Sequence, residues 1–473
     1  MRTMKYANGK VSGIKIGYIG GGSRGWAWGL MSDLASCGDI SGEVRLYDID
    51  RNAADSNEII GNRFRNSPGT NSEWNYRAVD TLEQALAQAD FVVISILPGT
   101  FDEMESDVHA PEAYGIYQSV GDTTGPGGIV RAMRTVPMYE TIAKAIREHC
   151  PQAWVINYTN PMTLCVKTLY REFPEIKAFG CCHEVFGTQK ILAKIVEQVF
   201  CESSVDRSEI KVNVLGVNHF TWLTQATYHN IDLFPVYDAF IREHGGAFPS
   251  DGTPADDNWM NNSFVSEEMV KMDLFRRFGW IAAAGDRHLA EFCEGAWYLA
   301  NPERVREMHF GLTSVAWRKQ DLAKRIARSQ RMVSGEEPVK IKKTGEEGVH
   351  QMRALLGLCE LTTNVNIPNR GQIPNLPLGA VVETNAVFRA GSLQPVFAGP
   401  VPKEIYPLVG RICSEQELVF EGIAERNLDK IFMGFAADPL TTCGIGDAKK
   451  LFAQMCRNTQ KYLTMYPLDR LPV

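Results

Sequence analysis

Four residues that can bind a metal ion or move a proton occupy consecutive positions, Cys181, Cys182, His183 and Glu184. Thiolate, imidazole and carboxylate groups are the side chains that proteins use for both tasks. The four residues follow an apolar segment, 176–179, that is typical of a strand, and they precede an apolar helical pattern over 185–200. Ligand sites in open parallel sheets lie at strand ends, so we expect a site here. The alternative for adjacent cysteines is packing, because a buried thiol behaves as a small apolar group.

His219 follows another predicted strand, residues 212–215. A parallel sheet would bring it close to Cys182 although the two residues are far apart in the chain. One thiolate and one imidazole are too few for a closed structural zinc site, but they suit an open site that substrate oxygens and water complete. The alternative for an isolated histidine beside an apolar strand is a structural role.

Two further groups of polar residues could contact a ligand. Asn157 and Asn160 stand beyond a predicted strand at 154–156, where neutral amides could hold a sugar hydroxyl or a nicotinamide. Because Pro161 follows, the same residues are equally typical of a turn. The second group contains a potential acid–base pair and a guanidinium that could bind an anion: Asp286, Arg287, His288 and Glu291. Its alternative is a solvated helix start with Asp286 as the N-cap.

The elements that must position these residues begin with a dinucleotide-binding pattern. A predicted strand, 14–19, leads into Gly20, Gly22 and Gly25 in G-x-G-x-x-G spacing, and a predicted helix, 26–35, follows. In that context the glycines permit a tight turn and a close approach of the backbone to a pyrophosphate. The helix N-terminus then offers amide groups to the anion.

Asp48 ends a second predicted strand, residues 44–48. An acidic residue at this point suits the ribose diol of NAD⁺ rather than the phosphate of NADP⁺. The alternative is a cap for a helix predicted at 52–60, and the two roles are compatible.

Strand and helix patterns continue to alternate through residue 200. A strand is predicted at 91–96, and helices at 81–89, 129–149 and 162–170. A glycine-rich loop, residues 121–128, would let backbone approach a ligand closely. This alternation predicts a doubly wound parallel sheet. The second half is less regular: we predict a loop over 233–262, helices over 266–278, 346–358 and 404–428, and short strands within 373–384.

Composition excludes several classes of partner. The chain has 473 residues, 44% of them hydrophobic, and a net charge of -7, so no basic footprint for nucleic acid is expected. The longest apolar runs, such as 91–97, have the length of strands, which predicts no membrane association. Residues 1–12 are polar and lack the apolar core of a signal peptide. Eleven cysteines without framework spacing predict a reducing, cytoplasmic compartment.

Five ordered motifs together resemble those of glycoside hydrolase family 4, the NAD- and metal-dependent glycosidases, over nearly the whole chain. The motifs are Ile19-Gly20-Gly21-Gly22-Ser23, Gly125-Pro126-Gly127-Gly128, Asn157-x-Thr159-Asn160-Pro161, Gly180-x-Cys182-His183 and Gly216-x-Asn218-His219. Cys182-His183-Glu184-Val185 resembles the subgroup that acts on α-galacturonides. Ile96-Leu97-Pro98-Gly99 lacks the arginine that members acting on phosphorylated sugars tend to carry. The resemblance therefore implies a pectin-derived uronide oligosaccharide as the substrate.

The family's fold and reaction are carried over as expectations. A Rossmann-like NAD-binding domain, 1–210, would precede an α+β substrate-binding domain of the lactate/malate dehydrogenase C-terminal type, 211–473, in a homodimer or homotetramer. The implied reaction moves a hydride from sugar C3 to NAD⁺, removes the C2 proton, eliminates the C1 leaving group, adds water and returns the hydride. A divalent metal, Mn²⁺ by resemblance, would hold the C2 and C3 oxygens.

The resemblance also implies roles for single residues. Cys182 and His219 would be metal ligands, His183 the acid and Asp286 the base. Asn157 would contact the sugar, and we expect Arg287 or His288 to pair with the uronate carboxylate. Glu184 would repel a uronate, so we expect it to orient His183 or a metal-bound water. The expected cofactor-binding residues are Gly20, Gly21, Gly22, Ser23, Arg24, Asp48, Ser95 and Asn157.

Other functions remain open at this stage. A dehydrogenase of the malate or lactate kind would accumulate NADH, whereas the hydrolase would release sugar without net NADH. A non-catalytic NAD-binding sensor would bind the cofactor without exchanging the C2 proton. Within the family, α-galactosidase and α-glucuronidase are the alternatives.

Overall fold

The main sheet has the strand order of dinucleotide-binding proteins. The computed structural model describes residues 4–248 and 266–471. Six parallel strands lie side by side in the order β7 (Lys177–Gly180), β6 (Trp154–Asn157), β5 (Phe91–Ile94), β2 (Lys10–Ile19), β3 (Ile40–Tyr47) and β4 (Trp74–Ala78). The chain thus runs outward in both directions from the boundary between β2 and β5, where such sheets bind their ligands. The predicted doubly wound parallel sheet is confirmed.

The C-terminal half of the chain extends this sheet. Beyond β7 the order continues with antiparallel strands β12 (Leu361–Pro368), β13 (Val381–Arg389) and β14 (Ser392–Pro395), and the short β1 (Lys5–Ala7) pairs with β2. The predicted strands within 373–384 therefore begin only at Val381. The predicted division into domains at residue 210 stays a prediction, since strands β12, β13 and β14 from residues 211–473 extend the sheet built by residues 1–210.

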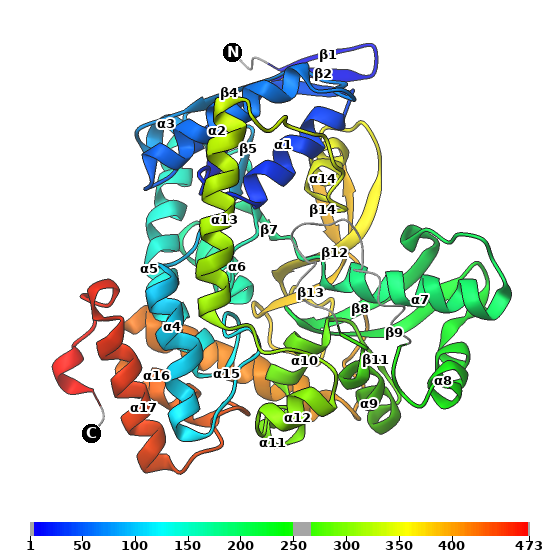
Figure 1. Cartoon of the computed structure of the whole chain (residues 1–473), viewed down its shortest axis with the longest axis vertical. Coiled ribbons are helices and arrows are strands. Elements are labelled where there is room, and N and C mark those ends of the chain that lie inside the picture. Colours follow the sequence, from blue (N-terminus) through cyan, green and yellow to red (C-terminus); the bar gives the residue numbers. More distant parts are fainter. Residues whose placement is uncertain (1–3, 249–265, 472–473) are drawn as a thin grey trace.

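Helices cover both faces of this sheet (Figure 1). They include α1 (Trp26–Ser36), α2 (Arg51–Arg63), α3 (Leu82–Leu86), α5 (Gly125–His149) and α6 (Met162–Glu172), while α4 (Phe101–His109) packs on α5 and α7 (Glu184–Phe200) packs against the strand at Ile210–Val217. We did not predict α4, although Thr100 and Glu103 form a capping box at its start. Nor did we predict β4, although Trp74, Tyr76 and Ala78 alternate as buried positions.

A second, antiparallel sheet carries the other half of the site. It contains β8 (Ile210–Val217), β9 (Phe220–Tyr228), β10 (Ile231–Asp232) and β11 (Ile281–Ala282). We expected a parallel sheet to bring His219 close to Cys182. That reason is wrong, because β8 belongs to the antiparallel sheet and not to the parallel one. His219 instead lies in the two-residue turn between β8 and β9, with a φ of 65°. This left-handed conformation is uncommon for residues other than glycine, although histidine adopts it more readily than most.

The remaining helices are α8 (Leu233–Glu243), α9 (Met269–Phe278), α10 (Asp286–Phe292), α11 (Gly295–Tyr298), α12 (Pro302–Glu307), α13 (Val315–Ser334), α14 (Gly348–Leu355), α15 (Tyr406–Glu425), α16 (Leu428–Ala437) and α17 (Ile445–Asn458). The predicted loop over 233–262 is wrong in its first part, where Asp232 caps α8. Its last part, 249–262, lies outside the described residues. The predicted helix 404–428 is α15, which ends before the left-handed Arg426.

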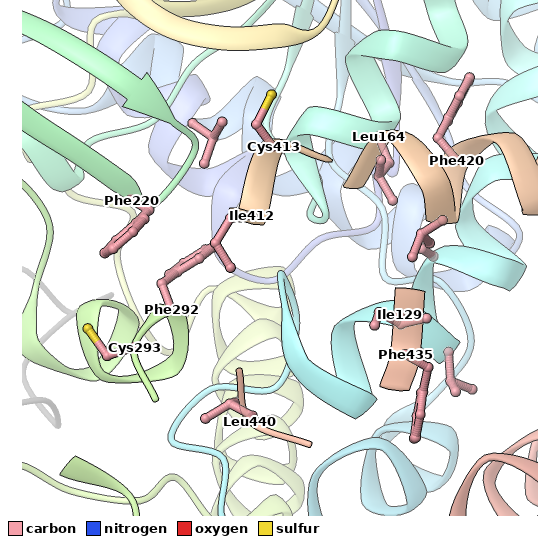
Figure 2. Packing of buried hydrophobic residues seen from close by; sticks show 14 of the residues in the cluster. Ile129, Leu164, Phe220, Phe292, Cys293, Ile412, Cys413, Phe420, Phe435 and Leu440 are labelled. Carbon is pink, nitrogen blue, oxygen red and sulfur yellow. The ribbon is translucent and has the colours of Figure 1, made fainter. Parts of the chain in front are cut away.

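The largest buried cluster packs directly behind the hairpin that carries His219. Figure 2 shows Phe220 of β9 and Phe292 of α10 within it, and their rings stack with centroids 5.1 Å apart. His219 precedes Phe220, and His288 lies one helical turn before Phe292. Aromatic packing of this kind contributes beyond the buried area alone, so the cluster fixes both histidines relative to each other. In the described part of the chain, no helix combines the length and the apolar character needed to cross a membrane.

A buried ion pair stabilises the contact between α4 and α5. Arg134 donates to both carboxylate oxygens of Asp107, and neither side chain is exposed. Removing Asp107 leaves a buried guanidinium without its counter-ion, so Asp107→Ala should lower the free energy of unfolding by about 3–5 kcal/mol. Chemical denaturation measures this change. On the same helix, Asp102 pairs with Lys319 while 79% of its side chain is exposed, and Asp102→Ala should cost less than about 1 kcal/mol. Equal losses of stability in the two variants would contradict the stabilising role of the Asp107–Arg134 ion pair.

Candidate functional site

The turn after β2 is shaped for close approach of a ligand. Gly20 has a φ of 89°, and a Cβ there would lie 2.0 Å from the carbonyl oxygen of Ser95. The N-cap of α1, Gly25, supplies no side-chain hydrogen bond, so the first amides of the helix are left for an anion. The carboxylate of Asp48 accepts a 2.9 Å bond from the Gly22 amide, and burial raises the pKa of Asp48. These features fit a dinucleotide whose pyrophosphate lies at α1 and whose ribose lies at Asp48.

Other residues expected at the cofactor lie around this turn. Ser23 donates its amide to the Gly20 carbonyl, and Arg24 lies 3.6 Å from the carboxylate of Asp50. Asp50, not Asp48, is the N-cap of α2. Asn157 is fully buried, and its amide is engaged by Tyr139 and Thr159 at 2.5–3.1 Å. The side chain of Asn157 therefore shapes the strand end rather than facing a sugar.

Asp122, His219 and His288 form a group whose ligand atoms all lie within 4.8 Å of one another. The imidazole rings stack with centroids 3.8 Å apart. Thr123 donates its hydroxyl to Asp122 at 2.7 Å, so the Nδ1 of His219, 2.9 Å from that hydroxyl, is the donor to it. This arrangement leaves the lone pair of the His219 Nε2 for a metal ion.

The electrostatics of this group keep His219 neutral and Asp122 charged. Burial, and then the charge of His288, lowers the pKa of His219 to about 3. Burial would raise the pKa of Asp122, but the positive charge of Arg131 lowers it below its usual range. Neutral imidazole and charged carboxylate are the forms that bind divalent cations, so the donor set fits such an ion.

His183 and Glu184 lie beside this group. The Nδ1 of His183 is 3.0 Å from Glu346, and its Nε2 is 3.7 Å from Glu184, which is also 3.8 Å from the Nε2 of His288. Burial would lower the pKa of His183, but Glu346 and then Glu184 raise it to about 9. Burial would raise the pKa of Glu184, but His288 and His183 lower it to about 2. Glu184, held by the Gly285 amide at 2.7 Å, thus links the two histidines.

Cys182 is buried but is not a member of the Asp122 group. Burial, and then the charges of Glu383 and Glu184, raise the pKa of its thiol. These effects outweigh the lowering by hydrogen bonds, so the pKa lies well above the usual value. A bound cation would favour the thiolate instead. Cys181 is also buried, and its thiol pKa is raised well above the usual value by burial first and then by Glu346, which is consistent with packing.

Glu383 of β13 connects the two segments that carry the predicted metal ligands. Asn364 donates to Glu383 at 2.6 Å and to the carbonyl of Cys182 at 3.3 Å. Asn218, next to His219, donates to the other oxygen of Glu383 at 3.2 Å. This network holds the Cys182 segment and the His219 turn in one place.

The structure does not bring Asp286 together with these residues. Its carboxylate accepts hydrogen bonds from the Ser266 hydroxyl at 2.8 Å and from the amides of Val270 and Lys271 at 3.1 and 3.0 Å. The N-cap of α9, Glu268, supplies no side-chain bond, so Asp286 satisfies the first amides of that helix. Burial and the charge of Glu268 raise the pKa of Asp286 to about 7.

Arg287 is engaged by the protein itself. Its guanidinium donates to the carbonyls of Gly311 at 3.1 Å and Ser119 at 2.5 Å, and to the hydroxyl of Thr313. The expectation that Arg287 pairs with a substrate carboxylate has no support in these contacts. Its neighbour His288 does lie in the site.

Sequence reasoning missed Asp122, Glu346 and Glu383 as site residues. Asp122 lies in the glycine-rich loop that we predicted to approach a ligand, so a carboxylate in that loop was the available signal. Glu346 and Glu383 have no motif of their own, because their places depend on how the chain returns to the first sheet.

Comparisons with known proteins agree with this geometry. The family 4 glycosyl hydrolase model matches residues 15–198, and the model of the family's C-terminal domain matches residues 214–441. An alpha-galacturonidase from Thermoanaerobacterium saccharolyticum is 60% identical over 97% of this chain and 98% of its own. The crystal structure of lplD from Bacillus subtilis has a TM-score of 0.88 at 49% identity, over 94% of this chain and 100% of that chain. A 6-phospho-beta glucosidase from Thermotoga maritima, solved with manganese, NAD⁺ and glucose-6-phosphate, shares the fold with a TM-score of 0.73 at 20% identity, over 95% of this chain and 99% of that chain.

Proposed function

The chain belongs to glycosyl hydrolase family 4, and from that premise we propose that it is an α-galacturonidase that uses NAD⁺ and a divalent metal ion. The observation that carries the proposal is a chain of contacts between the two sheets: Trp26 of α1 lies against His183 with ring centroids 6.1 Å apart, and Glu184 lies 3.8 Å from His288, which stacks on His219. The dinucleotide turn at Gly20 lies on the first sheet, and the His219 turn lies on the second. The relative that is 60% identical bears the name alpha-galacturonidase, which supports the uronide as the substrate.

The cofactors would supply the chemistry that side chains lack. When bound, NAD⁺ supplies the reversible oxidation of sugar C3, and the metal supplies the Lewis acidity that makes the C2 proton removable. The α1 N-terminus and Asp48 would hold the dinucleotide. We propose His219 and Cys182 as the metal ligands.

His183 would donate the proton to the departing oxygen at C1. Glu346 holds its Nδ1 and orients the ring, so the Nε2 side faces Glu184 and the histidine pair. Glu184 would keep His183 protonated through its negative charge, and its expected role in orienting His183 or a metal-bound water stays a prediction. Asp286 stays a prediction as the base, and its bonds to α9 favour a structural role.

Two further properties complete the proposal. All eleven cysteines are free, which supports a reducing, cytoplasmic compartment. A homodimer or homotetramer is proposed from the family resemblance alone.

The test compares two substrates that differ only at C6. The wild-type enzyme, assayed with Mn²⁺, NAD⁺ and a thiol reductant, should cleave nitrophenyl α-galacturonide at least about 100-fold more efficiently than nitrophenyl α-galactoside, because a site built for a charged group rejects the analogue that lacks it. Preference for the galactoside would overturn the proposal. Net accumulation of NADH would instead indicate a dehydrogenase.

A further inference from the structure

A cation is needed where the site itself is acidic. Asp122 and Glu184 lie around the histidine pair, and Glu291, whose pKa burial raises to about 8, accepts the amides of Val120 and Gly121 at 2.7 and 2.9 Å. A uronide brings another negative charge into this region. Without a positive partner, like charges would oppose its binding.

Arg318 on α13 lies at this place. Its Nε is shielded from solvent and has no hydrogen-bond partner among the described residues. Burial lowers the pKa of Arg318, while the nearby charges of Asp122 and Glu291 raise it. The described carboxylates form no ion pair with it within 4.0 Å, so the Nε is a buried donor without a partner among the described residues. Buried polar groups are almost always satisfied, and a missing ligand is one reason for an exception.

The start of α13 is fixed against the site. Ser314 caps the helix by accepting the amide of Trp317, and Val315 is buried against Met104 and Val108 of α4. Just before the helix, Thr313 binds both the Ser119 carbonyl and the guanidinium of Arg287. Arg318, one turn further on, is therefore held beside the 119–122 loop rather than free in solvent.

The position of Arg318 along α13 separates it from the cofactor phosphates. Figure 1 shows α13 running from the region of α4 to that of α2, and α13 packs against both helices. Arg325 donates to the carbonyl of Arg24 at 3.3 Å, which places that part of α13 at the dinucleotide turn. Seven residues of helix separate Arg318 from Arg325, and they span roughly 10 Å. Arg318 thus lies away from the dinucleotide turn and near Asp122 and Glu291.

The other arginine with an unpartnered donor is engaged differently. Arg131 has a buried Nη1 without a partner, but its Nε donates to the Asn160 carbonyl at 3.2 Å. Its charge is also the largest that lowers the pKa of Asp122, so it neutralises that carboxylate. Arg287 is engaged by backbone carbonyls, which leaves Arg318 as the available cation.

We propose that Arg318 binds the C6 carboxylate of the sugar and so determines the preference for uronides. A guanidinium presents two parallel donors that match a carboxylate, which gives both strength and direction. The proposal rests on the proposed function, because it assigns the substrate contact of that same site.

The experiment compares Arg318→Met with the wild type on both nitrophenyl substrates. Loss of a buried charged contact should lower kcat/KM for the galacturonide by about 100-fold or more. The change should appear mainly in KM, and kcat/KM for the galactoside should change less than about 3-fold, a difference close to the scatter of surface substitutions. Arg318→Lys should fall between the two, since an ammonium keeps the charge without the paired donors.

Controls keep the outcomes distinct. Arg331 lies on the same helix, is half-exposed and pairs with Glu337. Arg331→Met should therefore leave kcat/KM for both substrates unchanged. NAD⁺ and Mn²⁺ affinities of Arg318→Met should equal those of the wild type, and calorimetric binding of free galacturonate should weaken in parallel with kcat/KM. Equal losses on both substrates, or weakened NAD⁺ binding, would overturn the assignment of Arg318. Absence of galacturonide cleavage by the wild type would instead defeat the proposed function itself.

Discussion

Replacing His219 with alanine should abolish most of the metal-dependent activity, with a loss in kcat/KM of about 10³-fold. That factor corresponds to about 4 kcal/mol of transition-state stabilisation, within the range that a Lewis-acid metal supplies. The reason is geometric: Thr123 and Asp122 fix the proton of His219 on Nδ1, so Nε2 is held ready as a ligand.

The measurement is a Mn²⁺ titration followed by activity and by calorimetry. His219→Ala should need far more Mn²⁺ than the wild type, while NAD⁺ binding is unchanged. His149→Ala, at the far end of α5, is the control and should behave as the wild type. Normal Mn²⁺ affinity in His219→Ala would exclude His219 as a ligand.

The same titration separates two possible ligand sets. If Cys182 and His219 hold the ion, Cys182→Ser should weaken Mn²⁺ binding by about 10- to 100-fold, and Asp122→Asn should have a smaller effect. If the group of Asp122, His219 and His288 holds it, the order of the two effects is reversed. The second outcome would show that the assignment of Cys182 is wrong.

Replacing His183 with alanine should also have a large effect, and its size should depend on the leaving group. A positioned acid contributes about 10²–10⁴-fold where the departing alkoxide needs a proton. A galacturonide disaccharide should therefore lose activity to that extent. Nitrophenol leaves without help, so the nitrophenyl substrate should lose far less.

Glu346→Gln tests the orientation of His183. It keeps the shape of the side chain but removes the charge that holds Nδ1 at 3.0 Å, so it should reduce activity on the disaccharide less than His183→Ala does. Both variants should bind Mn²⁺ and NAD⁺ normally. Equal losses on the disaccharide and the nitrophenyl substrate would contradict the role of His183 as the acid.

The sequence was informative wherever a site residue belongs to a local pattern. The strand at residues 14–19, the glycine turn and Asp48 are read from neighbouring residues, because the turn is built within one strand–helix unit. His183 and His219 were found because each follows an apolar run. The reason given for expecting Cys182 near His219 was wrong, since the hydrophobic pattern of 212–215 does not tell a parallel strand from a hairpin.

Residues whose role depends on packing between distant elements were not predictable. Asp286 looks like the start of its own helix, yet its carboxylate caps α9, and only the contact between α9 and α10 decides this. Arg287 and Arg318 are the same residue type, and neither belongs to a local pattern that predicts its contacts. One donates to backbone carbonyls and the other keeps an unpartnered donor, and the difference follows from how α13 crosses the molecule.

The central claim, a redox-assisted elimination on a uronide without net oxidation, is tested most directly by one incubation in heavy water. The wild-type enzyme is given a galacturonide disaccharide with NAD⁺ and Mn²⁺, and the products are followed by NMR and by NADH absorbance. We predict galacturonate that carries deuterium at C2, with no net rise in NADH. Release of galacturonate without deuterium at C2, or one NADH formed per turnover, would contradict the account.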